Sequence, residues 1–292
     1  MIKKKFFTST INKIINKNSI QTVYNFAPVI KMLKFATKDT LVIFDVDNVL
    51  IRSGGEDDFR HPYRTKLWQE IKCRSTPQKI ECLCSSILYA TKRYLTDLRI
   101  IDIFNYLKLQ NVPAIALTTM GTGNFGIIEK MEDIRVNELN DLGISFLPLT
   151  PLQDELLIPE LENTNMIFEN CKGTPILKQG IIFTAVVDKG VVLKTILHKY
   201  NYYPKTIIFV DDYINNLESL KQLCIELEIN FYGFHYKAAS LRSLPNINED
   251  LEKLLFKNLE QNLYWLNYEK LLDKNYLMNH YSFFNQLNLN YQ

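Results

Sequence analysis

LVIFDVDNVL, residues 41–50, is the most informative stretch of this chain. Its first four residues are apolar, and such a run predicts a β-strand that is buried on both faces. The strand ends in two carboxylates, Asp45 and Asp47, with one residue between them. Burying an ionised carboxylate costs several kcal/mol unless a cation or hydrogen-bond donors pair with it. The pattern therefore predicts a metal or phosphoryl site at the carboxyl end of an open α/β sheet. A strand followed by an acidic turn is the alternative.

Two further apolar runs end in polar residues in the same way. They are PAIAL (113–117), followed by Thr118 and Thr119, and TIIFV (206–210), followed by Asp211 and Asp212. Between them, Lys189 opens a segment whose apolar periodicity predicts a helix. Ligands of open α/β sheets bind at the carboxyl ends of the strands, so we expect these side chains to share one crevice.

The order Asp-x-Asp, Thr, Lys, Asp-Asp resembles the motifs of the haloacid dehalogenase-like (HAD) superfamily of phosphohydrolases, over roughly residues 38–236. The phrase FYGFHY (231–236), with the helical tail after it, is similar to an uncharacterised bacterial branch of that superfamily. The resemblance implies a Rossmann-like α/β fold. We expect an open parallel sheet with helices on both faces, a helical cap insertion and a helical C-terminal extension.

The expected domains follow from the positions of these motifs and from helical periodicity. We expect a helical N-terminal arm (1–37), a core (38–50 and 113–240), a helical cap or insertion (51–112) and a C-terminal helical extension (241–292). The last helix of the insertion, beginning near Thr96, would return the chain to the sheet, and the earlier ones would form the cap. Residues 8–36 are predicted to be largely helical, and residues 173–187 to contain a hairpin. Ordinary core helices are the alternative for the cap, and an exposed partner surface is the alternative for the extension.

The chemistry expected of these residues begins at Asp45. A carboxylate can attack phosphorus and form an aspartyl-phosphate, which divides hydrolysis into two easier steps. Asp47 is the predicted general acid–base, and the resemblance implies that its backbone carbonyl binds the metal. Asp45, Asp211 and Asp212 are the other predicted ligands, and Mg²⁺ suits such hard oxygen donors. Helix N-capping is the alternative role for this acidic pair.

Thr118 and Lys189 are the predicted phosphate-binding residues. The hydroxyl would donate to a phosphoryl oxygen, and the ammonium would neutralise charge on the transferred group. Thr119 and Lys194 are their alternatives. Asn215 or Asn216, one turn into the next predicted helix, could orient the acidic pair.

Composition bounds the remaining possibilities. The chain has 292 residues, 47% of them hydrophobic and 23% charged, and its net charge of +2 gives no reason to expect nucleic acid as a partner. The sequence contains no run of 18 apolar residues, so we expect no membrane span. Polar residues interrupt the basic N-terminus where a signal peptide would be apolar, which favours a cytoplasmic protein. Export with an intact N-terminus stays open.

Five cysteines form no readable disulfide framework. A zinc site could be drawn from Cys73, Cys82, Cys84 and His61, but Cys-x-Cys is not the usual spacing for zinc. Reduced thiols, including Cys171 and Cys224, are the better interpretation.

The sequence thus predicts a Mg²⁺-dependent phosphatase that acts on a small phosphorylated substrate. A phosphotransferase is one alternative, and a non-catalytic binding or host-interaction protein on the same fold is another. The substrate and the oligomeric state have no signature in the sequence.

Overall fold

The computed structural model describes residues 17–54, 61–153, 155–162 and 173–266. These residues form two compact units. Unit 1 contains residues 17–52, 93–125 and 129–242, and unit 2 contains residues 53–92, 126–128 and 243–266, in each case where described.

Unit 1 is built on an eight-stranded sheet in the order β1-β10-β9-β2-β5-β8-β7-β6. Six neighbouring strands run parallel: β1 (Ser19–Val23), β10 (Asn230–Tyr236), β9 (Thr206–Asp211), β2 (Thr40–Phe44), β5 (Ala114–Thr118) and β8 (Ile181–Phe183). Beyond them, β7 (Ile176–Lys178) pairs antiparallel with β8, and the edge strand β6 (Leu156–Leu157) pairs antiparallel with β7. The predicted α/β class is confirmed, although the sheet is mixed rather than wholly parallel.

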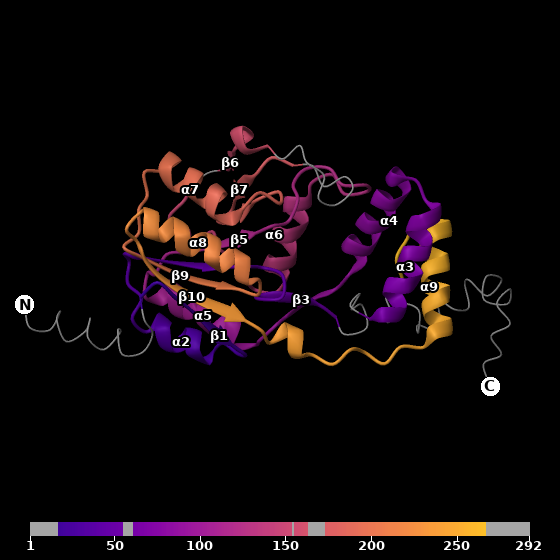
Figure 1. Cartoon of the computed structure of the whole chain (residues 1–292), viewed down its shortest axis with the longest axis horizontal. Helices are drawn as coiled ribbons and strands as arrows, with labels where there is room; N and C mark the ends of the chain where they lie inside the picture. Colours follow the sequence, from indigo (N-terminus) through magenta and orange to yellow (C-terminus); the bar gives the residue numbers. More distant parts are fainter. Residues whose placement is uncertain (1–16, 55–60, 154, 163–172, 267–292) are drawn as a thin grey trace, which may run out of the picture. The chain divides into compact units, whose positions relative to one another are not determined.

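Helices cover both faces of this sheet (Figure 1). One face packs against α2 (Ala27–Leu33), α5 (Arg99–Leu109) and α6 (Met131–Asp141), and the other against α7 (Lys189–Lys199) and α8 (Ile214–Glu226). Alternate residues of β2 divide between the two cores: Val42 and Phe44 join the first, and Leu41 and Ile43 the second. Every residue of β2 is buried, as its apolar run predicts.

The chain reverses its direction across the sheet between β2 and β9. From β2 it moves to β5 and then β8, with α5 and α6 preceding these strands on one face. It then crosses to the far side of β2 to form β9 and β10, with α7 and α8 on the other face. In open α/β sheets such a reversal opens a crevice at the carboxyl ends of the two strands, which is where ligands bind.

The N-terminal segment differs from the predicted helical arm. Within the described residues it contributes the edge strand β1 before the short helix α2, and β1 pairs in parallel with β10. Ile20, Thr22 and Val23 are β-branched and suit a strand. The segment forms a strand because it pairs with β10, which is distant in the sequence, and local periodicity does not reveal this pairing. The start of the predicted helix, residues 8–16, lies outside the described residues.

The hairpin predicted within 173–187 is confirmed as β7 and β8. Its two loop residues, Gln179 and Gly180, have φ of 50° and 78°. Positive φ at both positions is typical of the two-residue turns whose twist matches that of the strands. A Cβ at Gly180 would lie 2.8 Å from the Cβ of Phe146, so the turn also needs the absence of a side chain.

Unit 2 is helical. Its helices are α3 (Pro62–Arg74), α4 (Pro77–Ala90) and α9 (Glu249–Asn262). Ile71, Leu83, Leu255 and Trp265 lie in its small core. The described residues also include a two-stranded sheet of β3 (Ile51–Ser53) and β4 (Arg93–Leu95). Two 3-10 turns, η1 (Pro159–Leu161) and η2 (Ala239–Leu241), complete the elements of this part of the chain.

This division can be compared with the expected domains. The last helix of the 51–112 insertion is expected to return the chain to the sheet, and α5 does so, because its Ile100, Phe104 and Leu107 pack into the core of unit 1. Helix α9, from the predicted C-terminal extension, shares its core with α3 and α4. No helix among the described residues is both long and apolar enough to cross a membrane.

Candidate active site

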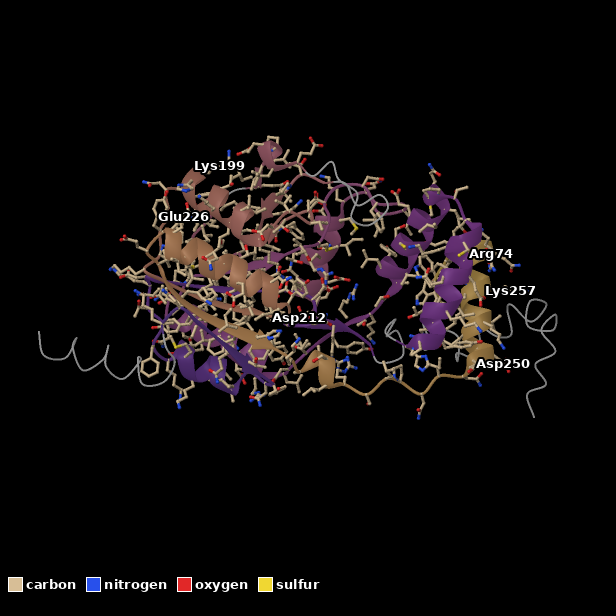
Figure 2. The ribbon with its side chains drawn as sticks, in the orientation of Figure 1. Arg74, Lys199, Asp212, Glu226, Asp250 and Lys257 are labelled. Carbon is tan, nitrogen blue, oxygen red and sulfur yellow. The ribbon has the colours of Figure 1, made fainter. Side chains whose placement is uncertain are left out.

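Three carboxylates meet at the crevice between β2 and β9. Asp45 directly follows β2, Asp211 is the last residue of β9, and Asp212 comes next. Figure 2 labels Asp212. One carboxylate oxygen from each lies within 4.8 Å of the others, and within the described residues this is the one group of acidic, histidine or cysteine side chains with such a geometry. Asp45 and Asp211 are buried, and Asp212 is partly buried. The sequence predicted that these three residues would gather.

Lys189 lies at the centre of this group. Its Nζ donates to Oδ1 of Asp45 at 2.6 Å and to Oδ2 of Asp211 at 2.7 Å, and its side chain is fully buried. Lys189 is the first residue of α7, where Asp188 caps the helix by accepting the backbone N–H of Val191 at 3.0 Å. Burial opposes the charged form, but Asp45 and Asp211 outweigh it and raise the pKa of the Lys189 ammonium. The lysine is therefore a fixed cation.

This arrangement disfavours the ionised form of two of the carboxyl groups and so raises their pKa values. Burial, opposed by Lys189 and reinforced by Asp211, raises the pKa of Asp45 well above its ordinary value. Burial and then Asp211 raise the pKa of Asp212 to about 6, against a hydrogen bond from Asn48 that lowers it. Three ionised carboxylates and one ammonium would leave a formal charge of −2 in a buried space. Repulsion of this kind favours protonation unless further positive charge is supplied.

Asp211 is held by the start of α8. Its Oδ1 accepts the backbone N–H of Tyr213 at 2.8 Å, and the Nδ2 of Asn216 lies 3.1 Å from both of its carboxylate oxygens. Of the two asparagines considered from the sequence, Asn216 contacts the acidic group, whereas Asn215 donates to the Tyr213 hydroxyl. These contacts fix the orientation of a carboxylate that also binds Lys189.

Asp47 lies apart from the three-carboxylate group and is paired with Arg135 of α6. The guanidinium Nη1 is 3.0 Å from Oδ1, and Nη2 donates to Oδ2 at 3.1 Å. Arg135 is not among the site residues predicted from the sequence. A single arginine in the largely polar segment Met131–Asp141 carries no local signal, because its partner is 88 residues away.

The two predicted phosphate-binding residues come from different parts of the crevice. Thr118 ends β5, beside β2, and its buried hydroxyl accepts the backbone N–H of Met120 at 3.4 Å. Thr119, its alternative, is exposed. Lys194, the alternative to Lys189, pairs with Glu226 at the surface, away from the acidic group.

Thr184 is a further candidate that sequence reasoning missed. It directly follows β8, and its backbone N–H donates to the carbonyl of Thr118 at 2.9 Å. Its buried hydroxyl has no hydrogen-bond partner in the part of the chain that the structure describes. A buried hydroxyl without a partner can donate a hydrogen bond to a bound anion, and that bond would stabilise the anion.

The segment that leads to Lys189 is strained. Ala185 and Val186 have φ of 48° and 68°. Left-handed backbone is unfavourable for a β-branched residue, at about 1–3 kcal/mol, and such conformations are concentrated at functional sites. The backbone N–H groups of both residues donate to carbonyls of the β5 loop, those of Met120 and Thr119. These bonds hold the strained segment against the end of β5.

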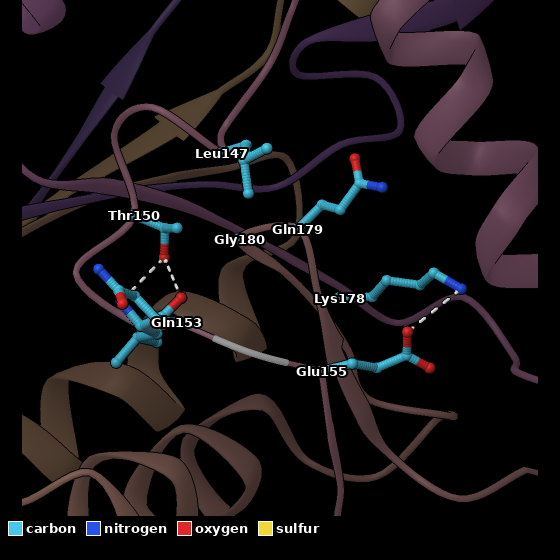
Figure 3. A pocket seen from close by; sticks show the side chains of 8 residues that line it. Leu147, Thr150, Gln153, Glu155, Lys178, Gln179 and Gly180 are labelled. Atoms are coloured by element: carbon cyan, nitrogen blue, oxygen red, sulfur yellow. Dashed lines mark hydrogen bonds and ion pairs between the residues drawn. The ribbon is translucent and has the colours of Figure 1, made fainter.

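A cavity of about 390 Å³ lies elsewhere in unit 1. Leu147, Thr150, Lys178 and Gly180 are among the residues that line it (Figure 3). Gly180 precedes β8, so this cavity borders the amino end of that strand, whereas the acidic group lies at the carboxyl ends. None of the predicted site residues lines it.

The alternative zinc site does not form among the described residues. Among the described residues, no disulfide joins the thiols of Cys73, Cys82, Cys84 and Cys224, and none of them joins a metal-ligating group with His61. The nitrogen Nδ1 of His61 instead caps α3 by accepting the N–H of Tyr63. Cys171 lies outside the described residues.

Comparisons with known proteins identify a family. The model of the family described as "Protein of unknown function (DUF2608)" matches residues 22–274, and the chain belongs to this family. An uncharacterized protein of Rickettsia bellii is 25% identical over 215 residues, which cover 69% of this chain and 70% of that protein. Among solved structures, a haloacid dehalogenase-like family hydrolase from Streptococcus pneumoniae is similar at 13% identity and a TM-score of 0.35. That match covers 69% of this chain and 96% of the other, and it says nothing about activity.

Proposed function

We propose that this protein is a Mg²⁺-dependent phosphomonoester hydrolase whose nucleophile is Asp45. The observation that carries the proposal is the meeting of Asp45, Lys189 and Asp211 where the strand order reverses, with Asp212 beside them. A purely structural ion pair would not need two carboxylates on one buried lysine and a third carboxylate beside them. A site that binds a cation and a phosphoryl group would need both kinds of charge.

The donor set fits a hard divalent cation. Carboxylate oxygens of Asp45, Asp211 and Asp212 would hold it, and these are the ligands that Mg²⁺ prefers. One such ion carries +2 and would neutralise the formal charge of −2 left by the three carboxylates and Lys189. When bound, the cation would withdraw charge from the phosphoryl oxygens and allow two anions to approach each other.

The first proposed step is attack by a carboxylate oxygen of Asp45 on phosphorus. The new bond from Asp45 to phosphorus forms as the bond from phosphorus to the ester oxygen breaks. Asp47, which pairs with Arg135 as a carboxylate in the substrate-free protein, would take up a proton as the anionic substrate binds and give it to the departing oxygen, so that an alcohol leaves rather than an alkoxide. The product is an aspartyl-phosphate on Asp45.

The second step is hydrolysis of that intermediate. Asp47, now a carboxylate, takes a proton from a water molecule as its oxygen attacks phosphorus. The bond between phosphorus and Asp45 breaks, inorganic phosphate leaves, and both aspartates return to their starting forms. In both steps, Lys189 would neutralise charge on the transferred group, and the hydroxyl of Thr118 would donate to it. Because Lys189 already contacts Asp45, it would need little movement to do so.

Release of inorganic phosphate tests the proposal. The purified chain would be offered p-nitrophenyl phosphate and a panel of metabolite phosphates, with Mg²⁺ and with a chelator. We expect turnover that requires the metal and that Asp45→Asn abolishes. Asp39→Asn is the matched control, because Asp39 precedes the same strand at its opposite end and its carboxylate pairs with surface Lys205. Turnover that survives in Asp45→Asn would reject Asp45 as nucleophile, and a folded but inert wild type would favour a binding protein.

A further inference from the structure

The side chain of Arg135 is a buried cation aimed at the proposed general acid–base. Only 3% of it is exposed, whereas 45% of the Asp47 side chain is exposed. The guanidinium Nη2 donates to Oδ2 of Asp47 at 3.1 Å, and Nη1 lies 3.0 Å from Oδ1 as an ion-pair contact without a hydrogen bond. A planar guanidinium that meets both oxygens of a carboxylate fixes its position and its orientation.

Arg135 is itself held in place by a chain of contacts. Its Nη1 lies 3.2 Å from Oε2 of Glu138, one turn along α6, and its Nε lies 3.3 Å from Sδ of Met120. Glu138 in turn accepts a hydrogen bond at 3.0 Å from Nε of Arg93 on β4. The charges alternate from Arg93 to Asp47, so each is compensated. Burial of the guanidinium opposes its charged form, but Asp47 and Glu138 outweigh burial and raise its pKa.

The position given to Asp47 suits a group that must serve a leaving group. Asp45 is buried beneath the crevice, but Asp47 faces outward, where the alcohol part of a substrate would lie. Each carboxylate oxygen has a second lone-pair site that Arg135 leaves open to a substrate. Without Arg135, the Asp47 side chain would regain its rotamers, and as a fourth carboxylate near the site it would compete for the cation.

We propose that Arg135 is a positioning residue that holds Asp47 away from the metal ligands and presents it to the leaving oxygen. The inference rests on the proposed phosphatase function and assigns a role that the sequence did not predict. Arg135 takes no part in bond making. It acts only through Asp47, which passes one proton to the ester oxygen while the phosphoryl group moves to Asp45.

A role of this kind predicts a dependence on the leaving group. p-Nitrophenolate departs readily without a proton, whereas p-methoxyphenolate is a stronger base and needs one. The ratio kcat/KM includes steps only up to the first phosphoryl transfer, so it reports on the leaving group and not on the later hydrolysis. Loss of Arg135 should therefore lower kcat/KM for p-methoxyphenyl phosphate about tenfold or more, and that for p-nitrophenyl phosphate much less.

The experiment measures kcat and KM for both aryl phosphates with the wild type, Arg135→Met and Arg135→Lys. Arg135→Lys keeps the charge but not the two-point contact, so we expect an intermediate loss; it also carries the test if Arg135→Met fails to fold. Asp133→Asn is the matched control, because it removes an ion pair to Lys178 from the same helix without touching Asp47. It should leave the ratio between the two substrates unchanged.

A double-mutant cycle shows whether Arg135 acts through Asp47. In an Asp47→Asn background, a further change at Arg135 should leave the substrate ratio where Asp47→Asn alone puts it. Additive losses in the cycle, or equal losses on both substrates, would overturn the proposal, since they indicate phosphate binding or a general structural role. An inert wild type would overturn the phosphatase function, and this inference with it. An active wild type with an insensitive Arg135 would overturn this inference alone.

Discussion

Unit 2 contains a buried ion pair whose loss should be costly. Arg64 of α3 donates through Nε to Oε2 of Glu252 on α9 at 2.8 Å and through Nη2 to Oε1 at 2.6 Å. Neither side chain is exposed to solvent. The perturbation is Arg64→Met, which keeps the apolar length of the side chain and removes the charge. It leaves Glu252 buried without its principal partner.

The expected magnitude follows from burial. Removing one member of a fully buried ion pair costs about 3–5 kcal/mol, because the remaining charge is uncompensated. The matched control lies on the same two helices, where Arg74 contacts both carboxylate oxygens of Glu260 at 2.9 and 2.7 Å. There the Arg74 side chain is 56% exposed, and water replaces the lost contact. Arg74→Met should therefore have a much smaller effect.

The assay is urea unfolding followed by tryptophan fluorescence. The chain has two tryptophans, Trp68 and Trp265, and both pack in the core of unit 2, so the signal reports on this unit. With a slope of about 2 kcal/mol per molar urea, a loss of about 4 kcal/mol lowers the midpoint by about 2 M. The apolar double variant Arg64→Met with Glu252→Leu should recover much of that loss, since no charge remains buried.

Equal shifts for Arg64→Met and Arg74→Met would refute the reasoning, because burial is the difference between the two pairs. An unchanged midpoint for Arg64→Met would refute it as well.

Three further predictions concern unit 1 and the thiols. Lys189→Met should lower kcat at least about a hundredfold, because a charged contact to the reacting group is lost, whereas Lys194→Met at the surface should retain activity; phosphate release measures both. Burial raises the pKa of the Cys224 thiol to about 12, so at pH 8 it stays protonated, and iodoacetamide should label exposed Cys73 but not Cys224 in the native protein, as peptide mass mapping would show. Gly180→Ala should destabilise unit 1 by about 1–2 kcal/mol, because alanine is strained at positive φ, and thermal unfolding by circular dichroism checks this.

The residues predicted to form the site share one kind of signal. Asp45, Thr118 and Asp211 each end or follow a buried apolar strand, and strands of an open parallel sheet place their carboxyl ends along one edge. The gathering of Asp45 and Asp211 could be predicted because it depends on local patterns and one general rule of topology. Lys189 followed from its place at the start of the next helix.

The features that the sequence did not predict depend on contacts between distant segments. Arg135 reaches Asp47 across 88 residues, and no local pattern distinguishes it from a surface arginine. Strand β1 exists because it pairs with β10, more than 200 residues later. Helix α9 has an apolar face, but periodicity does not say which core that face joins.

The central claim is that Asp45 forms a covalent phosphoryl intermediate. The most direct measurement is acid quenching of the protein during turnover with Mg²⁺ and p-nitrophenyl phosphate, followed by mass spectrometry of the peptide that contains residues 41–50. We predict one added phosphoryl group on Asp45 in the wild type and more of it in Asp47→Asn, which loses the base for hydrolysis, and none in Asp45→Asn. A phosphoryl group on another residue, or turnover with no adduct on Asp45 in either the wild type or Asp47→Asn, would contradict the account.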